Sequence, residues 1–303
     1  MDKRLYTRLI KAEARRLGFD HCGISEACFL EDEAHRLEQW LKKGMHGEMS
    51  YMERNSDKRL DPRKLMPGAR SVISLLLNYW PGEKRKFTPK ISVYALGEDY
   101  HFVIRDMLNE LLEYMRGEIG MVEGRGFVDS APVMERAWAV KSGLGWTGKN
   151  ANLITKRCGS YHFIAELIVD AELEYDRQTG SHCGKCTACM DACPTHAITS
   201  PGRVDGSKCI SYLTIEKKGD IPESFRDSYS DWIFGCDICQ EVCTWNRFAS
   251  PHHNVRLSDK KSTNISRADW KEMDEEEFNE KLNKSPLQRT GLQGMSRNVA
   301  FIE

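Results

Sequence analysis

The sequence predicts a fold of class α+β/α/β in two domains with a short helical tail. Helix-like and strand-like segments alternate through about residue 170, as expected of a domain with a mixed sheet. Eight of the 11 cysteines then fall between positions 183 and 243, which indicates a second domain built around metal ligands. The expected boundaries are 1–172 for the first domain, 173–250 for the second and 251–303 for the tail.

Hydrophobic spacing predicts the elements of the first domain. Helices are expected over 2–17, 31–43, 100–116 and 133–142, and strands over 19–24, 71–79, 126–128 and 161–170. Segment 71–79 is almost wholly apolar, which is typical of a strand buried on both faces. The polar tail is expected to form surface loops and one short helix.

The composition is that of a soluble globular protein. The 303 residues are 40% hydrophobic and 29% charged, with a net charge of -1. The N-terminus lacks the apolar core of a signal peptide, and no apolar run approaches the ~18 residues that span a bilayer. We therefore expect a cytoplasmic protein without a membrane contact, whose cysteines are metal ligands or thiols and not disulfides. The charge balance neither requires nor excludes nucleic acid.

The cysteine spacing predicts two [4Fe–4S] clusters. The first run, C-x2-C-x2-C-x3-C-P, is the bacterial ferredoxin pattern, in which the fourth cysteine of each run crosses to the other cluster. Cluster one would take Cys183, Cys186, Cys189 and Cys243, and cluster two would take Cys193, Cys209, Cys236 and Cys239. Zinc is the alternative, but zinc sites usually show two CxxC pairs and often a histidine. The three other cysteines, Cys22, Cys28 and Cys158, are interpreted as small buried hydrophobes.

Two further features have less certain meaning when taken alone. Segment 143–150 nearly matches a phosphate-binding loop, but Asn150 replaces the Ser/Thr that binds Mg²⁺, and a helix precedes it. Its glycines could instead let the backbone approach a large cofactor. Asp129 ends an apolar extended piece, where a carboxyl can act as a general acid, or can simply cap a turn or helix. The long segment between Cys209 and Cys236 could face a second cofactor.

Four segments together resemble one family. They are 97–101 (GEDYH), 128–136 (VDSAPVMER), 143–150 (GLGWTGKN) and 209–214 (CISYLT) with the cysteine set. The sequence is similar over about residues 1–250 to the epoxyqueuosine reductases, which act in queuosine synthesis in tRNA and are similar to reductive dehalogenases. The resemblance implies a nitroreductase-like, cobalamin-binding first domain and a ferredoxin-like second domain. Many members continue into HEAT-like repeats, which segment 251–303 does not contain in full.

The resemblance also implies a site. Asp129 matches the proton donor to the epoxide oxygen, and Tyr100 and His101 match a pair near it, although a helix-start residue packed in the interior would also explain each. Position in the similar segments suggests the cobalamin contacts, which are Arg59, Asp129, Leu153, Ser211, Asp237 and Ile238.

The implied partners are a tRNA anticodon loop and an external electron donor such as a flavodoxin or ferredoxin, with the chain acting as a monomer. Lys84–Lys86 and Lys217–Lys218 are candidate phosphate contacts or solvated surface charges. Two other functions stay open. One is a corrinoid and iron–sulfur reductase of a small molecule, which the missing export signal disfavours. The other is a two-cluster electron-transfer protein, which the first 170 residues disfavour.

Overall fold

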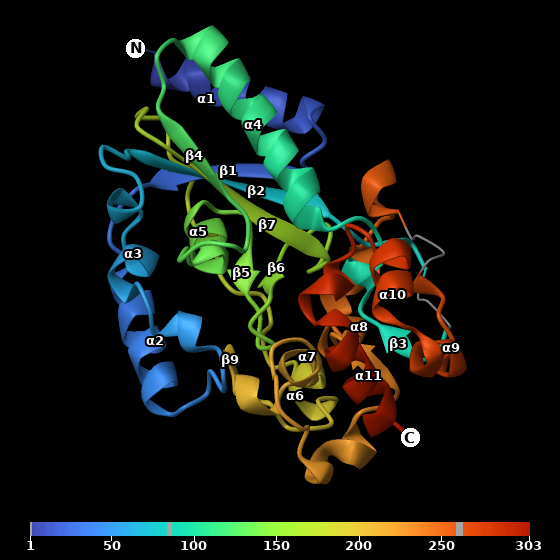
Figure 1. Ribbon diagram of the computed structural model, residues 1–303. Helices are drawn as coiled ribbons and strands as arrows, with labels where there is room; N and C mark the ends of the chain where they lie inside the picture. Colours follow the sequence, from blue (N-terminus) through green and yellow to red (C-terminus); the bar gives the residue numbers. More distant parts are fainter. Residues whose placement is uncertain (1, 84–86, 259–262) are drawn as a thin grey trace.

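The computed structural model describes residues 2–83, 87–258 and 263–303, and its centre is a four-stranded sheet (Figure 1). The strands follow the order β1 (His21–Glu26), β2 (Ser71–Asn78), β7 (His162–Val169) and β4 (Gly124–Phe127). Each neighbouring pair is antiparallel. The expectation of a mixed sheet is therefore wrong, because the helical segments between strands return the chain in the opposite direction and do not form parallel crossovers.

Helices cover both faces of this sheet, which explains why β2 is buried at all eight positions (Figure 1). On one face lie α1 (Lys3–Arg16) and α4 (Tyr100–Ile119), packed on side chains that include Ile73, Leu75 and Leu167. On the other face lies α5 (Glu135–Lys141), whose Trp138 packs with Val72 and Ile168. Alternate residues along each strand thus face different helices. The face that contacts α5 is called the α5 face below.

The remaining elements of the first domain lie around the sheet. Helices α2 and α3 and the short strands β3, β5 and β6 span Glu31–Lys42, Ser56–Leu60, Lys90–Ile91, Trp146–Thr147 and Leu153–Ile154. β5 and β6 form a hairpin. Most predicted helices and strands are confirmed with shifts of one to three residues at their ends. None of the helices in the described part of the chain is long and apolar enough to cross a membrane.

The cysteine domain is built from short elements. They are α6 (Ala188–Asp191), β8 (Ile198–Ser200), β9 (Arg203–Val204), α7 (Ile210–Ile215), β10 (Trp232–Phe234) and α8 (Ile238–Glu241). β10 pairs in parallel with β3. The segment between Cys209 and Cys236 is therefore joined by backbone hydrogen bonds to a strand that precedes it by more than a hundred residues.

The C-terminal segment is more ordered than the polar sequence suggests. It forms α9 (Arg267–Glu272), α10 (Glu275–Lys281) and α11 (Gly291–Phe301), so the expectation of loops with one short helix is wrong. Trp270, Phe278 and Met295 are buried in one apolar cluster with Ile233 and Phe234. Each helix supplies only a few apolar side chains, spaced for one face, and this explains why the segment reads as polar.

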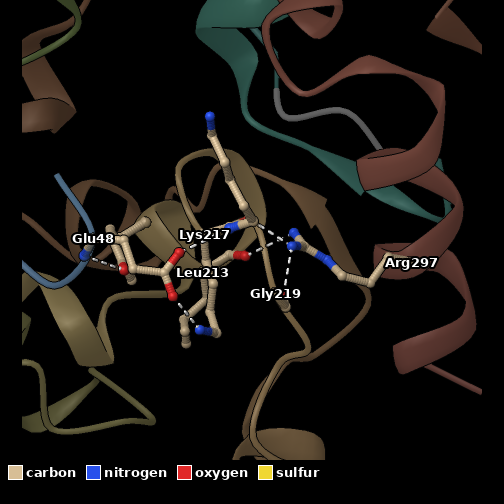
Figure 2. A network of polar contacts seen from close by, with 7 residues as sticks. Glu48, Leu213, Lys217, Gly219 and Arg297 are labelled. Atoms are coloured by element: carbon tan, nitrogen blue, oxygen red, sulfur yellow. Dashed lines mark hydrogen bonds and ion pairs between the residues drawn. The ribbon is translucent and has the colours of Figure 1, made fainter.

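Helix α11 is joined to the cysteine domain by one polar network (Figure 2). The guanidinium of Arg297 donates to the carbonyl oxygens of Leu213, Lys217 and Gly219. The Lys217 ammonium donates to the Glu48 carboxylate at 2.7 Å. This hydrogen bond, with one from the backbone of Lys218, lowers the pKa of Glu48. Lys217 is thus engaged in an ion pair, which weakens its candidacy as a phosphate contact, whereas Lys84–Lys86 lie outside the described residues.

Candidate active site

The four cysteines assigned to cluster one line one cavity. Its volume is about 180 Å³, and Cys183, Cys186, Cys189 and Cys243 all contribute to its wall. Three of them lie around the short helix α6, and Cys243 arrives after α8 from the second run. The structure thus brings together the four cysteines that cluster one needs if the fourth cysteine of each run binds the other cluster.

The other four cysteines also lie near one another. Cys236 is within electrostatic range of Cys209 and Cys239, and Cys239 is within range of Cys193. Burial raises the pKa of the thiols of Cys236 and Cys239, so their deprotonation calls for a bound metal ion. Cys239 is also in range of Cys189, which belongs to the first set. The two sets are therefore neighbours, as electron transfer between clusters requires.

The glycine-rich segment 143–150 contacts the cysteine domain. The indole of Trp146 donates to the sulfur of Cys183 at 3.4 Å, and the Lys149 ammonium donates to the carbonyl of Gly184 at 2.9 Å. A Cβ on Gly145 would lie 2.2 Å from the carbonyl oxygen of Ile154, so glycine is needed there for close packing on β6. The resemblance to a phosphate-binding loop therefore has no structural counterpart, and hydrogen bonds to cluster sulfur are known to tune redox potential.

Asp129 occupies a strained position directly after β4. Its φ is 48°, in the left-handed region that few non-glycine residues adopt. The phenol of Tyr100 donates to its carboxylate at 2.5 Å, and its backbone N–H donates to the carboxylate of Glu135. Burial and the nearby Asp129 carboxylate raise the pKa of Tyr100, which keeps this phenol protonated as a donor. Asp129 is thus held at a strained turn, its side chain by a group from α4 and its backbone by a group from α5.

Tyr100 and His101 begin α4 and are fixed by stacking. The Tyr100 ring lies on Phe163 with centroids 4.1 Å apart and on His101 at 4.2 Å. Asp99 caps the helix and contacts His101 Nδ1 at 2.6 Å. Burial opposes ionisation of Asp99, but the hydrogen bonds from His101 outweigh it and lower the pKa of Asp99. The pair is packed at a helix start and also lies beside Asp129, so both interpretations describe part of the arrangement.

Two carboxyl groups behind Asp129 were not foreseen from the sequence. Burial, and then the charge of Asp129, raise the pKa of Glu135 to about 8. Glu166 is wholly buried on the α5 face of β7, and within the described part of the chain neither of its carboxyl oxygens has a hydrogen-bond partner. Burial raises its pKa well above the usual range. In the sequence, Glu166 could have been noticed as an ionisable residue inside the largely apolar strand 161–170.

Replacing Glu166 with Gln is expected to make stability less dependent on pH. The folded parent keeps a proton on Glu166 that the unfolded chain releases near pH 4.3, at about the ordinary pKa of Glu. The parent therefore loses stability as pH rises above that value, whereas a Gln side chain does not titrate. The melting temperature of E166Q should exceed that of the parent by a margin that widens from pH 5 to pH 9. Each kcal/mol of difference in the free energy of unfolding should shift it by about 2–4 °C.

The control is Glu118→Gln, which changes an exposed carboxylate on α4. Its melting temperature should follow that of the parent at every pH. A constant difference between E166Q and the parent across the range would show that Glu166 is ionised in the folded protein, contrary to this expectation.

The residues expected to contact cobalamin lie on four segments. Arg59 lies in the last turn of α3, with one N–H donated to the carbonyl of Tyr51 at 3.0 Å, while its buried Nε has no partner among the described residues. Leu153 is buried on β6 and packs with Leu76 and Ala139. The half-buried Ser211 and Ile238 belong to α7 and α8. The Asp237 carboxylate accepts hydrogen bonds from the side chain of Ser92 and the backbone of Val93.

Two further residues, which the sequence did not point to, lie within electrostatic range of the candidate site residues. Tyr94 is within electrostatic range of both Asp129 and Asp237, the residue that follows Cys236. Arg289, from the C-terminal segment, pairs with Glu216 at 2.7 Å and is in range of Asp129. No motif marked Tyr94, and Arg289 stood in a segment noticed only for its similarity to repeat proteins.

These features define an iron–sulfur oxidoreductase in which a cysteine domain accompanies a site with the positioned carboxyl group of Asp129. Residues 182–246 match the family model described as "4Fe-4S double cluster binding domain", and residues 59–130 match that described as "Epoxyqueuosine reductase QueG, DUF1730". The chain belongs to the epoxyqueuosine reductase family. The resemblance noted in the sequence is thereby confirmed, and with it the iron–sulfur domain.

Curated relatives are similar to this chain along nearly its full length. An epoxyqueuosine reductase of Cellulophaga algicola is 55% identical, with 99% of each chain covered. That of Pseudomonas aeruginosa is 46% identical over 96% of this chain and 83% of the relative. A crystal structure of epoxyqueuosine reductase with an epoxyqueuosine-modified tRNA stem loop is 27% identical, with a TM-score of 0.91 over 98% of this chain and 80% of that chain.

Proposed function

We propose that this chain reduces epoxyqueuosine to queuosine within a tRNA stem loop, with Asp129 as the proton donor. The observation that carries the proposal is the arrangement of Asp129. Its carboxylate accepts from Tyr100, its backbone N–H donates to Glu135, and Tyr94 is in electrostatic range of both Asp129 and Asp237, which follows Cys236. A positioned acid next to an electron path is what reductive opening of an epoxide needs. The overall change consumes two electrons and two protons and yields an alkene and water.

The residues present fit the groups that this chemistry requires. Eight thiols in two neighbouring sets match the donor set of two [4Fe–4S] clusters. The unpartnered Nε–H of Arg59, buried in range of Glu135, is a donor suited to a corrin amide. We propose that Arg59, Leu153, Ser211, Ile238, Asp237 and Asp129 would hold cobalamin, which would supply a redox-active metal centre for the reaction.

The protein groups orient and move protons. Tyr100 holds one oxygen of the Asp129 carboxyl, so the proton on the other oxygen has a defined direction toward the epoxide oxygen. Glu135, with its pKa raised to about 8, keeps a proton at neutral pH and can return it to Asp129 after the transfer. His101, fixed by Asp99, and the Tyr100 ring form one wall beside the acid.

The partners form part of the same proposal. The base is read in an unstacked conformation, as modified bases in RNA loops usually are. The electron donor is an external flavodoxin or ferredoxin, and the chain works as a monomer in the cytoplasm. Lys218 is a candidate phosphate contact through its side chain, since only its backbone N–H is engaged by Glu48.

The test is turnover with defined substrates under anaerobic conditions. The cluster-loaded and cobalamin-loaded protein should convert an anticodon stem loop bearing epoxyqueuosine to its queuosine form, measured by mass spectrometry of the nucleosides. An aromatic halide supplied with the same reductant should stay intact. Conversion of the halide without conversion of the stem loop would replace this function with that of a small-molecule reductase, and conversion of neither would reject both.

A further inference from the structure

On the α5 face, three side chains that have no proposed role in the reaction lie close together. The ligand atoms of His21, Cys158 and His162 all lie within 4.8 Å of one another. We propose that they form a binding site for one Zn²⁺ ion, separate from the cluster cysteines. The earlier interpretation of Cys158 as a small buried hydrophobe is set aside by this proposal.

Strand pairing brings the two histidines together. His21 pairs with Leu76, and Leu76 pairs with Ile164, so these three side chains share one face of the sheet. His162 lies two residues from Ile164 along β7 and therefore shares the same face. The imidazole centroids are 5.8 Å apart. Because the edge strand β1 and the central strand β7 of one sheet fix this spacing, it does not depend on a loop.

The ring nitrogens are buried and unused. Nε2 of His21 and both ring nitrogens of His162 have no hydrogen-bond partner in the described structure. Buried polar atoms in native proteins almost always have a partner, so an unmatched group calls for an explanation. Burial lowers the pKa of both imidazoles, that of His162 to about 3, and this keeps them in the neutral form that binds metal ions.

Cys158 supplies the third ligand from a tight turn. A bridge between Thr155 and Gly159 closes the turn, and the Cys158 N–H donates to the hydroxyl of Thr155 at 3.1 Å. Two imidazoles and a thiolate are a donor set that zinc accepts, with a fourth position left for water. In a tetrahedral zinc site, N and S ligands are about 3.5 Å apart by the usual bond lengths. Binding would therefore draw the three atoms closer.

The charged groups around the three side chains, and the access of solvent to them, also suit a zinc ion. The carboxylate of Asp20 acts on both His21 and Cys158, and the guanidinium of Arg157 acts on the same two groups with opposite sign. A cavity of about 130 Å³ borders His21 and Asp20, so solvent can approach this side of the site. On binding, the thiol proton of Cys158 leaves to solvent, and the resulting thiolate and Asp20 offset the positive charge of zinc.

The ion would link the sheet to the cysteine domain. The turn that carries Cys158 ends at Gly159, and the next residue, Ser160, donates its N–H to Asn246 at 2.6 Å. Asn246 follows Cys243, a ligand of cluster one, by three residues. A zinc ion shared by β1, β7 and this turn would therefore brace the joint between the two domains.

The experiment uses the full chain with both clusters loaded, so that the cluster cysteines are occupied. The protein is incubated with Zn²⁺, desalted, and analysed for zinc and iron, and its zinc affinity is measured against a chelating indicator. We expect one zinc per chain with unchanged iron, and X-ray absorption at the zinc edge should show nitrogen and sulfur neighbours. Cys158→Ser and His162→Gln should each weaken zinc binding by more than about tenfold.

The matched control is Cys22→Ser, a thiol on β1 whose side chain packs on the opposite face of the sheet. It should keep the zinc. The melting temperature and iron content of each variant show whether it has folded. Absence of tightly held zinc from the parent, or its retention by folded C158S and H162Q, would overturn the proposal, and neither result would bear on the reductase function.

Discussion

Replacement of Asp129 with Asn is expected to lower kcat for the epoxyqueuosine stem loop by about 10²–10⁴-fold, the usual contribution of a positioned acid. Asn keeps an oxygen that accepts the hydrogen bond from Tyr100, so the local geometry should survive. What it loses is a transferable proton. Because substrate binding does not need that proton, KM should change little. Single-turnover kinetics with pre-reduced enzyme measure the step directly.

The control for this variant is Asp106→Asn, on the same helix as Tyr100. Asp106 forms an exposed ion pair with Arg256 at 2.7 Å, and its loss should leave kcat as in the parent. Iron and cobalamin contents should be equal in all three proteins. An Asp129→Asn enzyme that turns over like the parent would remove Asp129 from the role of proton donor, whereas loss of bound cofactor would make it a structural residue.

Exchange of cluster ligands for Ser is expected to reveal that the two cysteine runs share their clusters. Cys193→Ser and Cys209→Ser should each lose about half of the iron, because each removes a ligand of cluster two. The double variant C193S/C209S should lose no more than either single variant. By contrast, C189S/C193S should lose nearly all iron, although both cysteines belong to the first run. Iron analysis and electron paramagnetic resonance of the reduced protein measure both outcomes.

The control is Cys28→Ser, a half-buried thiol in the first domain, which should keep the full iron content. If C189S/C193S instead retains half of the iron, the two cysteines serve one cluster and the crossing assignment is wrong. Turnover should be lost in every variant that lacks a cluster, because the electron path is then broken.

Much of the architecture could be read from local patterns. The apolar run 71–79 gave β2, and the spacing of apolar residues gave α4, because burial on one or two faces leaves a period in the sequence. The cysteine runs gave the metal-binding domain because a cluster needs ligands at short, repeated intervals. Asp129 was noticed at the end of an apolar extended piece, whereas its role and the pair Tyr100 and His101 came from the resemblance. The structure brings the three together.

Other features depend on pairings between distant segments. The antiparallel order of the sheet is set by which strands meet, and no local pattern encodes that choice. The partnership of β3 with β10, and the approach of Arg289 to Asp129, join segments far apart in the chain. His162 and Glu166 were visible as ionisable residues at i and i+4 in an apolar strand, a spacing that puts both on one face. Which residues from other segments lie beside His162 and Glu166 became clear only from the three-dimensional structure.

The network around Arg297 has a consequence for biosynthesis. Three carbonyl groups between positions 213 and 219 receive their donors from Arg297, and Asn298 donates to the carbonyls of Thr214 and Ile233. The segment between Cys209 and Cys236 thus has its full set of hydrogen bonds only after the ribosome has released α11. Every cluster ligand emerges earlier than that. Iron–sulfur assembly on this chain is therefore expected to finish only once α11 has been made, on a domain whose last supporting helix arrives behind its ligands.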